Sequence, residues 1–283
     1  MLSQSARYFI PEPSRWPIFG SVALLCMALG AAAAFNGAPW GKFPLIAGLL
    51  ILAYMLAGWF TTVAHESESG QYNKQVDSSF RWSMSWFIFS EVMFFAAFFG
   101  ALFYMRVISV PDLAGLESQQ LIWPGFKGVW PASGPGITEP FSPMGAWGIP
   151  ALNTMLLLSS GVTVTWAHWG LLKNNRQQLI WGLAMTIGLG MTFLGFQIYE
   201  YVHAYSELNL KLTMGAYGAT FFMLTGFHGF HVTVGTIMLI VILFRSVAGH
   251  FRPEHHFGFE GVAWYWHFVD VVWLLLFVVV YWL

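Results

Sequence analysis

The chain has 283 residues, of which 57% are hydrophobic, 18% aromatic and only 9% charged. An average soluble domain carries roughly 25% charged residues, so this composition excludes a soluble protein and predicts a membrane protein. The net charge of -1 and the lack of a Lys/Arg cluster exclude a nucleic-acid partner, and the single Cys26 excludes an intrachain disulfide or a CxxC metal site.

Several apolar runs are long enough to cross a membrane. A helix rises 1.5 Å per residue, so crossing a ~30 Å hydrocarbon core takes about 20 residues. The sequence therefore predicts an all-α, polytopic membrane protein with seven transmembrane helices. Their expected positions are residues 16–35, 43–64, 82–104, 149–169, 179–201, 216–244 and 261–282. No signal-peptide cleavage pattern marks the first run, which we expect to remain as a span.

The Lys and Arg residues beside the spans predict the orientation, because cytoplasmic flanks carry an excess of them. The larger set falls on the side of the amino terminus and comprises Arg7, Arg15, Lys74, Arg81, Lys173, Arg176, Arg245 and Arg252. The smaller set falls on the opposite side and comprises Lys42, Arg106, Lys127 and Lys211. We therefore expect a cytoplasmic amino terminus and, after seven crossings, a carboxyl terminus outside.

Two polar segments divide the chain. The link HESESGQYNKQVDSS lies within an inner linker at 65–81, which separates an amino-terminal two-helix group at 1–64 from a five-helix bundle at 82–283. A long outer loop at about 107–148 is rich in Pro, Gly and Trp, a composition that favours turns and extended chain.

Glu91 is the most unusual residue of the chain. It lies about ten residues into the third span, roughly 15 Å deep. Phe87, Phe94, Phe95 and Phe98 stand at helical spacing from it and predict an aromatic face with one carboxyl in its middle. Two readings stay open: a carboxylic acid that donates one hydrogen bond to a neighbouring helix, or a group that takes part in proton delivery.

The last two spans carry three histidines and one aspartate, His228, His231, His267 and Asp270. An ionisable side chain at the bilayer centre costs roughly 2.5–3.5 kcal/mol on insertion scales, so such residues face protein or a polar cavity. They can form a non-haem metal site if these spans pack face to face. The favoured reading is a buried polar interface without metal, in which the imidazoles and the carboxyl satisfy one another.

Other polar residues stand near helix ends. His168 ends the fourth span, and Gln197, Glu200 and Tyr201 lie at the outer end of the fifth, where polar tips reach the interface at low cost, so structural roles are favoured. The inner loops gather cations and acids suited to lipid phosphates, namely Glu66, Arg245, His250, Arg252, His255 and His256. No Walker loop, GxGxxG, HExxH or GxSxG motif occurs, so we expect no catalytic residue in this chain.

Several short sequence segments resemble those of a known protein family. SRWP, SWFIFSEVMFFAAFFGALFY, SSGVTVTWAH, QIYEY, TGFHGFHV and HHFGFEGVAWYWHFVDVVW follow one another along almost the whole length. In this order they closely resemble subunit III of the haem–copper cytochrome c oxidases.

The resemblance implies a specific architecture and role. The two-helix and five-helix groups would form a V whose cleft holds phospholipids, and haem and copper would belong to partner subunits I and II, where cytochrome c is oxidised. The chain would be a non-catalytic subunit of an aa3-type enzyme that packs on subunit I and sustains proton uptake and turnover stability. By the same resemblance, Glu91 is the family's buried third-helix carboxyl, associated with proton uptake.

The resemblance also implies phospholipid contacts, at Trp59, Glu66, Arg245, His250 and His255. Phe60 and Ala248 depart from the aromatic Trp and basic Lys common in animal forms, so we expect a modified lipid set. The outer loop is longer than in animal mitochondrial forms, which favours a bacterial inner membrane over a mitochondrial one.

Three alternatives remain. The third subunit of a quinol oxidase is the nearest, although such chains usually lack the first two helices. A free-standing transporter with Glu91 as its carrier carboxyl would purify without haem-bearing partners. A metalloprotein in its own right would retain metal as an isolated chain.

Overall fold

The computed structural model describes residue 9, residues 11–137 and residues 139–283, and within these residues it contains helices and loops but no named strand. Seven of the described helices are long and apolar enough to cross a membrane, which confirms the predicted all-α, seven-helix class. Arg7, which entered the charge distribution, lies outside the described residues.

The chain divides into two compact units, Met1–Phe80 and Arg81–Leu283. The predicted grouping of two and five helices around a linker at 65–81, and the V-shaped lipid cleft, stay predictions.

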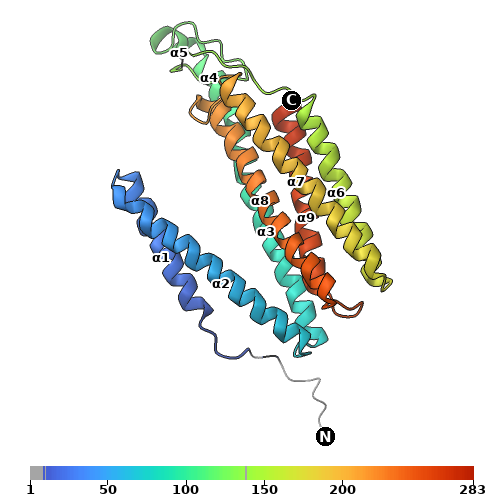
Figure 1. The fold of residues 1–283 in the computed structure, drawn as a ribbon. Helices are drawn as coiled ribbons and strands as arrows, with labels where there is room; N and C mark the ends of the chain where they lie inside the picture. The colour runs from blue at the N-terminus through green and yellow to red at the C-terminus, as the bar shows by residue number, and fades with distance from the viewer. Residues whose placement is uncertain (1–8, 10, 138) are drawn as a thin grey trace. The chain divides into compact units, whose positions relative to one another are not determined.

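The first unit contains a helical hairpin. Helix α1 (Trp16–Phe35) and helix α2 (Lys42–Glu68) are joined by the short turn η2 (Pro39–Gly41) and lie side by side (Figure 1). The buried residues of these two helices are nearly all small: Ala23, Gly30, Ala33, Gly48 and Met55. The two backbones can therefore approach closely, as is typical of membrane helix pairs.

The polar link between the second and third spans is largely helical. Helix α2 continues to Glu68 and helix α3 (Lys74–Phe103) begins soon after it, so only residues 69–73 lie outside helices. The side chain of Asn73 accepts a hydrogen bond from the backbone N–H of Val76 at 2.9 Å and so caps the start of α3. Polar residues beyond the membrane core can stay helical, which hydropathy alone does not reveal.

The second unit is a bundle built on α3 and the four long helices that follow it (Figure 1). Its remaining elements are η3 (Tyr104–Ser109), α4 (Val110–Leu113), α5 (Leu116–Leu121), α6 (Ile149–Leu172), α7 (Arg176–Ser206), α8 (Gly215–Ala248), α9 (Phe257–Leu276) and η4 (Phe277–Trp282). Short connections from α6 onward place consecutive long helices in contact with one another.

The third span is longer than the sequence predicts. From α3 the chain continues through the π-helical turn η3 and the short α4 to Leu113, so the expected outer loop starts after this residue rather than near Val107. Pro111 directly follows the wider turn and does not end the helical run, which continues to Leu113.

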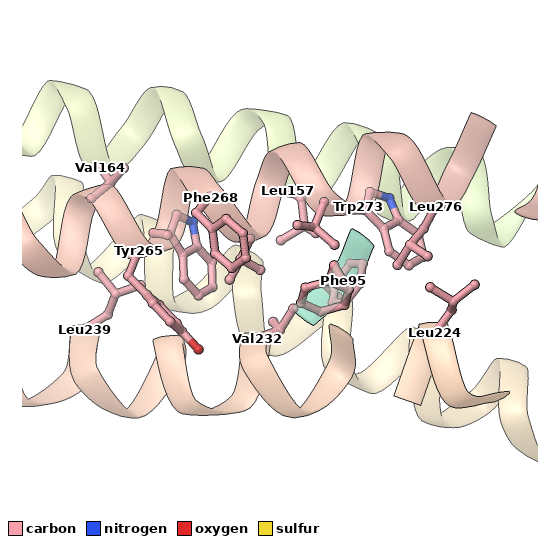
Figure 2. Close-up of a cluster of buried hydrophobic side chains, with 14 of the residues drawn as sticks. Phe95, Leu157, Val164, Leu224, Val232, Leu239, Tyr265, Phe268, Trp273 and Leu276 are labelled. Carbon is pink, nitrogen blue, oxygen red and sulfur yellow. The ribbon is translucent and has the colours of Figure 1, made fainter. Parts of the chain in front are cut away.

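The core of the second unit is aromatic and centres on α9. Tyr265, Phe268 and Trp273 of α9 meet apolar side chains of α6 and α8, with Phe95 of α3 beside them (Figure 2). Trp266 is fully buried and its indole N–H donates to the Ser160 hydroxyl at 2.8 Å. Glycines of α7 and α8 face the same indole ring, and a side chain there would overlap it. This packing fixes the rotation of α9.

Candidate functional site

Glu91 of α3 contacts a histidine of α8. Its carboxylate oxygen Oε2 lies 2.9 Å from Nε2 of His231. The imidazole is almost fully buried and the carboxyl is about one-fifth exposed. Sequence reasoning proposed both residues as polar sites but assigned them to separate groups, and the structure joins them in one pair.

The hydrogen bonds of His231 fix where its protons lie. Its other ring nitrogen, Nδ1, is 2.7 Å from the backbone carbonyl of Phe227. A carbonyl oxygen only accepts, so Nδ1 carries a hydrogen and Nε2 of the neutral ring presents a lone pair to Glu91. Two lone pairs at 2.9 Å would repel, so one proton lies between Oε2 and Nε2. The pair therefore holds a single transferable proton.

Aromatic rings surround this proton-holding pair. Phe94 and Phe95 lie with ring centroids 5.9 and 5.0 Å from the imidazole of His231, and Tyr265 stacks on it at 6.3 Å. Phe87 stacks on Tyr265 in turn. The predicted aromatic face of α3 thus forms an apolar wall beside the hydrogen bond.

The other polar residues of the last two spans do not form one network with His231. His228 is fully buried against the rings of Phe193 and Trp273, and neither of its ring nitrogens has a hydrogen-bond partner among the described residues. The expectation that the four residues satisfy one another therefore does not describe His228.

His267 and Asp270 form a separate contact. Nδ1 of His267 lies 3.9 Å from Oδ2 of Asp270, and its Nε2 lies 3.2 Å from the Thr165 hydroxyl of α6. A side chain at Gly161 would meet the Asp270 carboxyl at 2.6 Å, so this glycine makes room for it. The metal site considered for His228, His231, His267 and Asp270 does not converge in the described part of the chain.

A second buried carboxyl lies near the carboxyl-terminal end of α7. Glu200 is 1% exposed, and its Oε1 accepts a hydrogen bond of 2.6 Å from the Tyr281 hydroxyl. Tyr201 pairs with Thr225 at 2.7 Å. The sequence indicated interfacial positions for Glu200 and Tyr201, but the final helical turns enclose them. Sequence reasoning missed Tyr281. The available signal was its position near the carboxyl-terminal end of its helix, since Glu200 also lies near the carboxyl-terminal end of α7.

The predicted lipid-binding residues lie in both units. In the second unit, the guanidinium of Arg245 lies 4.7 Å above the ring of Phe251, and His250 and His255 are exposed beyond the end of α8. In the first unit, Trp59 is half exposed and stacks on Phe60. In each unit, these residues lie near the carboxyl-terminal end of a long helix, α2 in the first unit and α8 in the second.

Glu66 has a fixed partner within the first unit. The Tyr72 hydroxyl donates to its Oε2 at 2.6 Å. Burial, together with the negative charge and the hydrogen bond of Glu66, raises the pKa of Tyr72 well above its ordinary value. The hydroxyl therefore stays protonated and holds the carboxylate in place.

The described residues thus define a class of protein: an integral membrane helical bundle with a buried carboxyl–imidazole pair that joins two long helices, α3 and α8, and no nucleophilic catalytic arrangement found among them. The family profile of cytochrome c oxidase subunit III matches residues 6–283. The chain belongs to the cytochrome c oxidase subunit III family.

Individual relatives agree over their full length. The chain is 41% identical to cytochrome c oxidase subunit 3 of Marchantia polymorpha over 282 residues, covering 99% of this chain and 98% of the relative. It is 40% identical to the subunit of Triticum aestivum, covering 99% and 97%. It is also 40% identical to that of Danio rerio, covering 100% and 99%. The chain is therefore an integral membrane subunit of an oxidase complex.

Proposed function

We propose that the chain is a non-catalytic subunit of an aa3-type cytochrome c oxidase that packs on subunit I and sustains proton uptake and turnover stability. The observation that carries this proposal is the hydrogen bond between Glu91 and His231. It holds one proton between two titratable groups within the apolar layer, where such groups mark proton relays. Haem and copper belong to subunits I and II in this proposal, and cytochrome c is a substrate of the complex rather than of this chain.

The surface of α3 supports a partner at this place. Trp86, Phe89 and Met93 are all more than half exposed on the helix that carries Glu91. Lipid tails and an apolar protein surface can both cover such side chains, but a relay needs a continuing path. Subunit I, where oxygen reduction consumes protons, is the partner that gives the proton of Glu91 a destination.

The substitution Glu91→Gln tests the proton role. The amide N–H₂ can donate to the lone pair on His231 Nε2, so the hydrogen bond survives while the transferable proton is lost. We expect unchanged haem content and subunit composition in the purified complex, but slower proton uptake and a shorter turnover lifetime in reconstituted vesicles. The control is Ser90→Ala, on an exposed neighbouring position of the same helix.

Each result is decisive. Uptake equal to that of the wild type would end the proton role, and loss of haem would show that Glu91 acts in assembly instead. Purification of the chain without haem-bearing partners would instead support a free-standing transporter. Comparison of cytochrome c with quinol as donor separates the proposed oxidase from a quinol oxidase.

Phospholipid binding is the second part of the proposal. Arg245, stacked on Phe251 at the inner end of α8, is suited to a lipid phosphate, and the exposed His250 and His255 extend the surface. Trp59 and Glu66 are the proposed headgroup contacts of the first unit. We expect Arg245→Ala to reduce the phospholipid that co-purifies, measured by mass spectrometry, with little effect on folding.

The matched control is Arg252→Ala, which removes an exposed cation from the following loop. Equal phospholipid content in the wild type and Arg245→Ala would contradict the assignment. Equal loss in both variants would indicate a general surface charge rather than a site.

We further propose a bacterial inner membrane as the location, with the amino terminus cytoplasmic. The support is the long outer segment between α4 and α6 together with the excess of Lys and Arg on the inner side. Accessibility of cysteines introduced at Lys127 and His255 to a membrane-impermeant thiol reagent tests the orientation. Labelling of the His255 position from outside intact cells would overturn it.

A further inference from the structure

Two histidines and one carboxylate converge at the inner end of the five-helix bundle. Nε2 of His168, near the end of α6, lies 3.3 Å from Nε2 of His256, which directly precedes α9. Oε1 of Glu260, in the first turn of α9, lies 3.1 Å from the same Nε2 of His256. One ligand atom of each residue lies within 4.8 Å of the other two.

A backbone carbonyl outside this cluster determines which nitrogen of His256 carries the hydrogen. Nδ1 of His256 lies 3.2 Å from the backbone carbonyl of Arg252, which can only accept, so Nδ1 carries the hydrogen. Nε2 of the neutral ring therefore presents its lone pair to His168 and Glu260. Such a lone pair beside a carboxylate oxygen is repulsive unless a cation lies between them. The candidates are a proton and a metal ion.

The carboxylate is oriented in a way that suits a metal. Arg81 donates from Nε at 2.9 Å and from Nη2 at 2.8 Å, and both bonds reach Oε2 of Glu260. Oε1 is the oxygen that faces His256. Ligating histidines and carboxylates are commonly held by such outer hydrogen bonds, the histidine through its other ring nitrogen. Here the backbone carbonyl of Arg252 holds His256, and the side chain of Arg81 holds Glu260.

Two of the three separations between the ligand atoms also match a tetrahedral metal. Zinc binds imidazole nitrogen at about 2.0–2.1 Å and carboxylate oxygen at about 2.0–2.2 Å, so neighbouring ligand atoms of a tetrahedron lie about 3.3 Å apart. The two close separations in the cluster are 3.3 and 3.1 Å. Phe259 packs against the His168 ring with centroids 5.2 Å apart, which limits its rotation.

We propose that His168, His256 and Glu260 bind a divalent transition-metal ion, with Zn²⁺ the best fit. Two nitrogens and one oxygen leave the fourth position to water, as in open zinc sites. The ion joins the end of α6 to the start of α9. This site is distinct from the four residues of the last two spans considered for metal above, and it revises the expectation that the chain binds none.

The test uses the purified oxidase complex that contains this chain, treated with a chelator and titrated with Zn²⁺ alone against a competing dye. We expect the wild type to bind one zinc ion more per complex than His168→Ala or His168→Gln, or to bind it more than about tenfold more tightly. His203→Ala, which removes a partly exposed histidine from the last turn of α7, should match the wild type. Zinc sites on partner subunits cancel in the comparison.

Equal zinc stoichiometry and affinity in the wild type and His168→Gln would overturn the proposal and assign the cluster to a shared proton. The haem spectrum and subunit composition report whether each variant assembles. If both substitutions prevent assembly, the zinc K-edge spectrum of the loaded wild type decides. A shell with two imidazole nitrogens and one carboxylate oxygen supports the site, and any other shell contradicts it.

Discussion

The two units of the chain differ in how their helices pack. In the hairpin of the first unit, the buried positions are nearly all small, and a Cβ at Gly30 would lie 2.5 Å from the backbone nitrogen of Leu45. In the bundle of the second unit, the buried positions include Phe193, Trp266 and Trp273, each without measurable exposure. The hairpin is held by close contact of two backbones, whereas the bundle combines such contact between α6 and α7 with large rings in shaped spaces.

This difference explains where polar chemistry occurs. Large side chains separate helices enough to enclose carboxyls and imidazoles, such as Glu91, His231 and Glu200. Backbones in direct contact leave no such room, and the polar pair of the first unit, Glu66 and Tyr72, lies at the carboxyl-terminal end of α2 and in the link after it. The comparison can be tested by substitutions that affect one unit at a time, with hydrogen–deuterium exchange as the measurement for each unit.

The largest effect is expected from Trp266→Ala. The substitution empties the space between α7 and α8 and leaves the Ser160 hydroxyl without its indole donor. Truncation of a buried Trp costs about 3–5 kcal/mol in water-soluble cores, and we expect the lower end because lipid already solvates apolar groups. Exchange should rise throughout residues 81–283 and remain unchanged in the hairpin.

Trp181→Ala is the matched control, because Trp181 belongs to the same bundle but is about two-thirds exposed. A similar rise in exchange for both variants would show that the buried ring has no special part in the bundle. A rise in the hairpin as well would show that the two units do not unfold independently.

A smaller effect is expected from Gly30→Leu. The new side chain would overlap the backbone of α2 and force the two helices of the hairpin apart. Overpacking costs about 1–3 kcal/mol. Exchange should rise in α1 and α2 alone. Ala32→Leu, on an exposed position of the same helix, should leave exchange unchanged, and equal behaviour of the two variants would refute close backbone packing.

The sequence predicts much of this fold but does not predict which polar side chains pair with one another. Apolar runs locate all seven spans because hydropathy depends on composition alone. Helix ends differ from the prediction, since α2 and α3 include polar residues and the third span continues past Val107 through η3 and α4. The depth of Glu91 is readable from its place in its span, but its partner is not, because pairing depends on the rotation of α3 and α8 about their axes. Rotation is set by rings such as Trp266, whose contacts lie far away in the sequence.

The inner histidines illustrate the same limit. His250, His255 and His256 are indistinguishable in a basic, polar loop, yet only His256 turns inward to His168. The difference arises from the Arg252 carbonyl and the start of α9, neither of which has a residue-type signature. Sequence therefore identifies the polar groups of this chain, while their assignment to lipid, proton or metal requires three-dimensional contacts.

The smallest effect is expected from Tyr72→Phe in the first unit. The substitution removes the 2.6 Å hydrogen bond to Glu66, and a hydrogen bond to a charged group at a partly exposed position is worth about 1 kcal/mol. Exchange at residues 65–80 should rise slightly at neutral pH. Tyr54→Phe, at an exposed position of α2, is the control.

The effect of Tyr72 also has a defined pH dependence. Because folding raises the pKa of the hydroxyl, its contribution is fully present below the ordinary tyrosine pKa of about 10 and is lost as the pH rises through the higher folded value. The difference between the wild type and Tyr72→Phe should therefore stay constant up to about pH 10 and shrink above it. A difference that disappears already between pH 6 and 8 would mean that another group holds the inner end of the hairpin, and Glu66 would then be free to bind a lipid headgroup without displacing Tyr72.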